Sequence, residues 1–220
     1  QTMMSDGEKK LDKLLEEFDW LWVDYCKPGI ELAKKVENLL NKKRVNILVL
    51  QNHGLVIGAE TPLEAEMIQR RILEKVKLIG RGYVLRNKDK LKKLKDKFPE
   101  FVHLPKYDVI HSIANDQWSL KLSQMNPHCP DHAVFCGLKP LIISDLEKDF
   151  SKIKDLPYII IKNYGVILFQ KNESLEAMLR SQAEIFLKIP KNEKINLLGD
   201  NECKDLINWE AEKLRKSMIK

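Results

Sequence analysis

Two stretches of the sequence resemble each other closely enough to decide the fold. They are ILVLQNHGLVI at residues 47–57 and YIIIKNYGVIL at residues 158–168. In each, a short apolar run reaches an Asn–ring–Gly tripeptide, in which the ring is His or Tyr, and a second apolar run follows. Short apolar, β-branched runs are typical of buried strands, and the break at Asn and Gly is typical of a turn. The sequence therefore predicts the same strand–turn–strand unit twice.

A helix is expected after each of these units. Thr61, Pro62 and Glu64 form a helix start, with an N-cap, a proline at the first position and an acid at the third. After a one-residue shift, Leu-Glu-Ala at 63–65 aligns with Leu-Glu-Ala at 175–177. The duplication predicts an α/β protein with a layered αβα arrangement and two related lobes.

The sequence also predicts where the lobes begin and end. Residues 86–106 are basic and are closed by two prolines, which is typical of a connector. We therefore expect four parts: a first lobe at 1–85, a basic connector at 86–106, a second lobe at 107–190 and a helical tail at 191–220.

Composition narrows the functional classes. The chain has 220 residues with 44% hydrophobic content, enough for a packed core, and its apolar runs are too short to span a membrane. The polar start is unlike a secretory signal, and the four cysteines form no CxxC pair, so we expect a cytoplasmic protein with free thiols. The net charge is +6. The basic run at 81–97 lacks interleaved aromatics beyond Tyr83, which favours a solvated helix over nucleic-acid binding.

Histidine supplies the first candidate for chemistry. His53 stands in the first turn, where the following glycine lets another group approach closely. A hydrogen-bonded structural role is the alternative for this residue, because zinc needs three or four ligands and His53 is one. Tyr164, at the equivalent position of the second unit, cannot act as the same ligand.

A second group of metal-capable side chains lies within five residues. They are His128, Cys129, Asp131 and His132. Two prolines, Pro127 and Pro130, argue against a regular helix here. The sequence thus favours a rigid loop in which Asp131 and His132 make hydrogen bonds, with a second metal site as the alternative.

Several segments resemble the class II aldolase/adducin family. They are PGIELA at 28–33, LQNHGLVIG at 50–58 and TPLEA at 61–65, followed by residues 126–141 and the tail at 208–214. The chain is similar to the later half of that domain, and most similar to the aldolase part of bifunctional rhamnulose-1-phosphate aldolase/alcohol dehydrogenase proteins.

The resemblance implies a metal-dependent lyase that cleaves a small sugar or sugar phosphate by stabilising an enediolate. His53 would be one of three histidine ligands to a divalent metal, usually zinc, with Asn52 and Gly54 at substrate-binding positions. The resemblance also implies a homo-oligomer with active sites between subunits.

One departure from the family limits this expectation. No His-x-His pair occurs in the chain. We expect that pair and the catalytic carboxylate before residue 1 or on an N-terminal half of the same protein, so no catalytic residue is assigned and residues 1–220 alone should be inactive. The alternative is a non-catalytic, adducin-like binding or assembly module.

Overall fold

Contacts along the chain separate it into two units, each built around a three-stranded sheet. The structure, a computed structural model, describes residues 1–144 and 150–218. Unit 1 comprises Gln1–Leu78 and Glu193–Leu197, and unit 2 comprises Ile79–Asn192 and Leu198–Lys220.

The boundary after Leu78 precedes the expected one at 85/86 because Arg81 is anchored in unit 2. Its guanidinium donates to the Asp116 carboxylate at 2.7 Å and to the Phe186 carbonyl at 2.9 Å. Its backbone N–H donates to the Leu187 carbonyl. An ion pair to a half-buried carboxylate and these carbonyl bonds hold residues 79–85 in unit 2.

Unit 1 has a mixed sheet covered on both faces. Its elements are α1 (Gly7–Leu14), β1 (Trp20–Val23), α2 (Ile30–Leu40), β2 (Ile47–Leu50), β3 (Gly54–Ile57) and α3 (Pro62–Lys75). Strand β2 is central, parallel to β1 and antiparallel to β3. The parallel pair is joined through α2, as a βαβ crossover requires.

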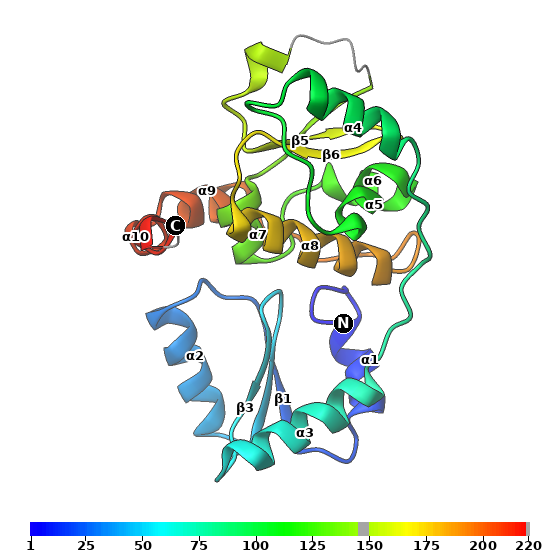
Figure 1. The fold of residues 1–220 in the computed structure, drawn as a ribbon. Helices are drawn as coiled ribbons and strands as arrows, with labels where there is room; N and C mark the ends of the chain where they lie inside the picture. The colour runs from blue at the N-terminus through cyan, green and yellow to red at the C-terminus, as the bar shows by residue number, and fades with distance from the viewer. Residues whose placement is uncertain (145–149, 219–220) are drawn as a thin grey trace. The chain divides into compact units, whose positions relative to one another are not determined.

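Alternating side chains of β2 divide the core of unit 1 in two. Ile47 and Val49 pack on the side of α1 and α3, and Leu48 and Leu50 pack on the side of α2. Figure 1 shows α2 on the opposite side of this sheet from α1 and α3. A strand buried on both faces must be apolar at every position, and the three layers follow from that.

The first five residues of unit 1 are held by a segment that is distant in sequence. Ser5 donates its N–H to the Lys194 carbonyl, and Asn196 donates to the Met3 carbonyl at 2.7 Å. Residues 193–197 therefore belong to unit 1, although the predicted tail at 191–220 otherwise lies in unit 2.

Unit 2 repeats the sheet of unit 1 and adds helices. Its elements are α4 (Lys88–Lys97), the 3-10 helix η1 (Asp108–His111), α5 (Ser112–Asn115), α6 (Gln117–Ser123), α7 (Pro130–Cys136), β4 (Leu141–Ile143), the 3-10 helix η2 (Phe150–Ile153), β5 (Tyr158–Ile161), β6 (Gly165–Leu168), α8 (Glu173–Lys188), α9 (Asp200–Asn208) and α10 (Glu210–Met218). Strand β5 is central, parallel to β4 and antiparallel to β6. The general α/β class is thus confirmed.

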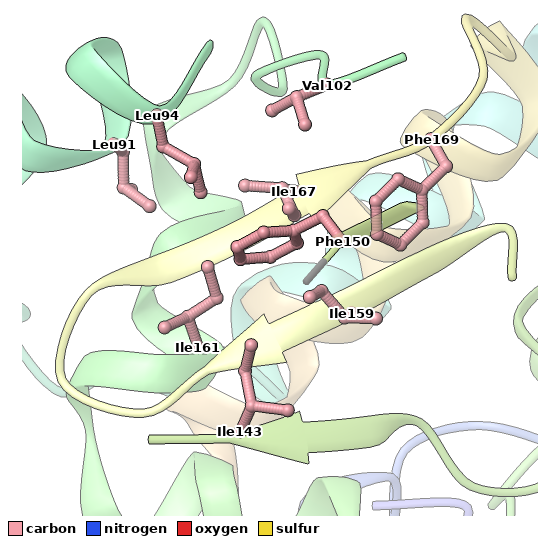
Figure 2. Packing of buried hydrophobic residues seen from close by; sticks show 9 residues of the cluster. All are labelled: Leu91, Leu94, Val102, Ile143, Phe150, Ile159, Ile161, Ile167 and Phe169. Carbon is pink, nitrogen blue, oxygen red and sulfur yellow. The ribbon is translucent and has the colours of Figure 1, made fainter. Parts of the chain in front are cut away.

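The segment expected as a basic connector contributes to the core of unit 2. Residues 88–97 form α4, and its Leu91 and Leu94 are buried against Ile161 and Ile167 of the sheet and against Phe150. Figure 2 shows both leucines over β5 and β6. The lysines of α4 lie around these apolar positions because a helix on a sheet needs one apolar stripe and leaves its other face to water.

The two strand turns have the same backbone hydrogen bonds. In unit 1, Leu50 accepts from the N–H of His53, and in unit 2, Ile161 accepts from the N–H of Tyr164. The residue after each central strand donates to the last residue of the parallel neighbour, Val23 or Ile143. The repeated sequence therefore folds into a repeated structure.

Both helices that follow these turns begin with a side-chain cap. Thr61 Oγ1 accepts the N–H of Glu64 at 3.2 Å before α3, and Asn172 Oδ1 accepts the N–H of Leu175 at 2.8 Å before α8. Each cap satisfies one of the free amides of a first turn.

Within residues 1–144 and 150–218, every helix is too short or too polar to cross a lipid bilayer.

A buried histidine fills the space beside the second turn. His111 is 2% exposed, and its Nδ1 accepts the N–H of Val166 at 3.1 Å. A Cβ placed on Gly165 would lie 2.4 Å from that Nδ1 and 2.7 Å from Leu91 Cδ1. Glycine is therefore required at 165 by the packing of His111 and Leu91.

His111 predicts a loss of stability in mild acid. Burial lowers its pKa to about 4, against about 6.5 in an unfolded chain. The neutral ring is favoured in the folded state, so its full contribution is present above pH 6.5 and is lost as the pH falls toward 4. The slope is about 1.4 kcal/mol per pH unit in that window. His111→Asn keeps an acceptor for Val166 without titrating, so urea unfolding should show a flatter pH dependence for the variant. Equal slopes would contradict this assignment.

Candidate functional site

The first turn is held by a buried asparagine. Asn52 has a left-handed backbone with φ 59°, which asparagine tolerates better than most residues. It is 3% exposed, and its Nδ2 donates to the Asn196 carbonyl at 2.8 Å. The side chain expected to bind substrate thus has a bond within unit 1 that fixes the turn.

His53 is oriented by its own unit. Its Nε2 lies 3.0 Å from the Cys26 carbonyl, and its ring stacks on Tyr25 with centroids 5.3 Å apart and planes 13° from parallel. Because a carbonyl only accepts, Nε2 carries the proton and Nδ1 holds the lone pair. Metal-bound histidines are oriented in the same way by a carbonyl on the other nitrogen.

The loop that carries Tyr25 and Cys26 is tied to the turn. The N–H of Tyr25 donates to the Gln51 side-chain oxygen at 2.8 Å, and the N–H of Gln51 donates to the Val23 carbonyl. The imidazole is therefore held at its edge by the Cys26 carbonyl and on its face by the Tyr25 ring, both in the loop that follows β1.

The space beside Gly54 is open. A Cβ placed there would meet nothing within 4 Å in the part of the chain that the structure describes, and its φ of 142° disfavours any side chain. At Gly165, the equivalent position in unit 2, His111 and Leu91 occupy that space. The first turn can thus admit a group from outside, and the second is filled.

In unit 2, three residues have donor atoms close enough to one another to bind a metal ion. Among the described residues this group consists of His128, Cys129 and His132, with ligand atoms within 4.8 Å of one another. It does not include His53. A cluster that could hold a metal ion is therefore present, at the second group that the sequence indicated.

The expectation of a loop at this cluster is wrong. Pro130 is the first residue of α7, a position at which proline costs nothing because that amide has no helical partner. The start of this helix brings His132 back to His128, with Nδ1 and Nε2 3.0 Å apart. Asp131, also a predicted member, instead pairs with Arg215 of α10 at 2.6 Å.

Burial keeps the members of the cluster neutral. It lowers the pKa of His128 to about 3 and that of His132 to about 4. It also raises the pKa of the Cys129 thiol to about 11, although the backbone N–H groups of His132 and Asp131 act in the opposite direction. Neutral imidazoles are the form that binds metals, while the thiol must lose its proton.

Sequence reasoning missed Tyr25, Cys26 and His111. The first two act through a ring face and a backbone carbonyl, and a carbonyl carries no residue-specific signal. The position of His111 beside Gly165 depends on the packing of η1 against β6, which no local pattern encodes.

Comparison with known proteins finds a distant relative. No family model matches the chain, and no solved structure matches it. The chain is 25% identical over 179 residues to the "Uncharacterized oxidoreductase YuxG" of Bacillus subtilis (strain 168). The match covers 69% of this chain and 26% of the relative, so the chain spans about a quarter of that protein.

Asn52 and Asn163, the asparagines of the two strand turns, are both left-handed, with φ 59° and 64°. They should differ in what their side chains contribute. Glycine adopts the same backbone, so Asn163→Gly should change the free energy of unfolding by less than about 0.5 kcal/mol. Asn52→Gly also removes the buried bond to Asn196 and should cost about 1–2 kcal/mol. Urea unfolding followed by circular dichroism measures both, and equal effects would mean that the Asn52 side chain contributes nothing.

Proposed function

We propose that this chain is part of a metal-dependent, class II aldolase-type lyase that cleaves a small sugar or sugar phosphate in the cytoplasm. The observation that carries the proposal is the first turn. His53 is oriented by the Cys26 carbonyl and the Tyr25 ring, beside a glycine whose outer side is open.

The residues at this turn suit a divalent ion such as zinc. With Nε2 protonated toward Cys26, His53 offers Nδ1 as one imidazole ligand. When bound, the ion supplies Lewis acidity toward a substrate carbonyl. Gly54 leaves room beside the ligand, and Asn52 holds the turn in its left-handed form.

The second turn supports a division of roles between the units. Tyr164 replaces the histidine, and His111 fills the space beside Gly165. A phenol is a poor zinc ligand compared with imidazole or thiolate. We assign the first unit to the active site and the second turn to the core of its own unit.

His53 needs further ligands, since zinc takes three or four. We propose that they come from a second subunit of a homo-oligomer or from an N-terminal half of the same protein. The relative's length fits this idea: the segments quoted above resemble aldolase parts fused to a dehydrogenase, and the relative is named an oxidoreductase and is much longer than the match.

The test is an aldol-cleavage assay on the native gene product that carries this chain. A panel of ketose 1-phosphates and free ketoses is supplied, and release of the carbonyl fragments is measured. Cleavage should stop on chelation and return with Zn²⁺. His53→Ala should lower kcat by more than the roughly 100-fold that loss of an outer hydrogen-bond partner of a metal ligand causes.

Tyr164→Phe is the matched control, because it alters the equivalent turn without touching the proposed site. It should retain wild-type kcat and zinc content. If His53→Ala also keeps full activity and zinc, the ligand assignment is refuted. If the wild-type protein cleaves none of the panel with zinc present, the non-catalytic binding module becomes the better account.

A further inference from the structure

The cluster in unit 2 brings three donors of a typical zinc set together. His128 and His132 are each 2% exposed, and their facing nitrogens are 3.0 Å apart. With Cys129, all three donor atoms lie within 4.8 Å of one another. Two imidazoles and a thiolate are ligands that zinc favours.

The distances are close to those of a bound state. Zinc bonds of about 2.0–2.1 Å to nitrogen and 2.3 Å to sulfur give tetrahedral edges of roughly 3.3–3.7 Å. The imidazole nitrogens need to separate by only a few tenths of an ångström, and the sulfur needs to move by about 1 Å at most. Side-chain rotation can supply both movements.

The loop before α7 is held in place by the start of α9. Asn126 Nδ2 donates to the Leu198 carbonyl at 3.0 Å and to Asp200 Oδ1 at 2.7 Å. The N–H of Leu198 donates to the Pro127 carbonyl at 2.9 Å. The ring of His128 also packs against Phe186 of α8, with centroids 5.2 Å apart. His128 therefore starts from a fixed position, which reduces the entropy lost on binding a metal.

Cys129 completes the set from the position immediately before α7. Its sulfur lies within 4.8 Å of the donor nitrogens of both histidines. Cys129 is partly exposed, while the two histidines are buried. An ion can thus enter from the cysteine side.

We propose that His128, Cys129 and His132 bind one zinc ion, at a site separate from His53, and that the ion fastens the loop before α7 to the first turn of that helix. The fourth position is left to water. On binding, Cys129 loses its thiol proton to solvent. The proton between the two imidazole nitrogens moves to the outer nitrogen of its own ring, so one proton is released for each zinc.

Cobalt(II) tests the site, because a thiolate ligand gives a sulfur-to-cobalt charge-transfer band that imidazole ligands do not give. The full chain, stripped of metal, is titrated with Co²⁺ and then with Zn²⁺. The band should saturate at one Co²⁺ per chain, disappear as Zn²⁺ displaces it, and be absent from Cys129→Ser. His132→Phe should weaken Zn²⁺ binding by more than about 100-fold.

Two controls separate this site from other thiols and from the turn. Cys26→Ser changes a partly exposed cysteine outside the cluster and should keep the band. His53→Ala should also keep it, so this experiment can fail or succeed independently of the aldolase proposal. Circular dichroism of the metal-free variants checks that they fold, and Zn²⁺ should raise the Tm of the wild type and of Cys26→Ser but not of Cys129→Ser.

The proposal is overturned if the wild-type chain shows no charge-transfer band, or if the band persists in Cys129→Ser. It is also overturned if Cys129→Ser and His132→Phe are folded and keep wild-type Zn²⁺ affinity. If both variants fail to fold, the wild-type band and its stoichiometry decide alone.

Discussion

The backbone hydrogen bond from His53 to the Leu50 carbonyl, closed over a left-handed asparagine, is the constraint on which this structure depends. It reverses the chain immediately after a fully buried strand, so that β3 returns along β2 in the register that pairs Leu50 with Gly54. The same bond and the same register recur at Ile161 and Gly165. Because side chains alternate across a strand, a slip of one residue here would move the side chains of the returning strand to the opposite faces of each sheet. The turn therefore determines both the packing of the layers and the direction in which the intervening ring points.

The two turns differ in their surroundings. In unit 2 the space beside the glycine is filled by His111 and Leu91, and the turn is part of a packed core. In unit 1 that space is open, and the ring is an imidazole held by a carbonyl and a stacked tyrosine. The two copies share a backbone and differ in these contacts. One copy can therefore contribute to stability while the other binds a ligand. For the cluster of His128, Cys129 and His132 at α7 we propose a third role, a metal that fastens a loop.

Much of the fold was predictable because the informative signals were local. The apolar runs and the Asn–ring–Gly turns predicted β2, β3, β5 and β6, and the Thr61 cap predicted the start of α3. Packing over long distances was not predictable. Leu91 and Leu94 looked like part of a connector, and their burial depends on a sheet formed by residues far along the chain. Pro130 predicts a break in a helix, but at the first helical position proline is favourable, and the helix that begins there brings His132 to His128. The orientation of His53 depends on a backbone carbonyl, which the sequence does not mark.

The central claim is that the first turn is the ligand-binding copy of a repeated unit. Anomalous diffraction at the zinc edge, from crystals of the native gene product grown with zinc, tests it most directly. The account predicts a peak about 2.0–2.1 Å from His53 Nδ1, with Nε2 still bonded to the Cys26 carbonyl, and no peak beside Tyr164. A structure with zinc in the crystal but none beside His53, or with a metal at the turn of Tyr164, would contradict it.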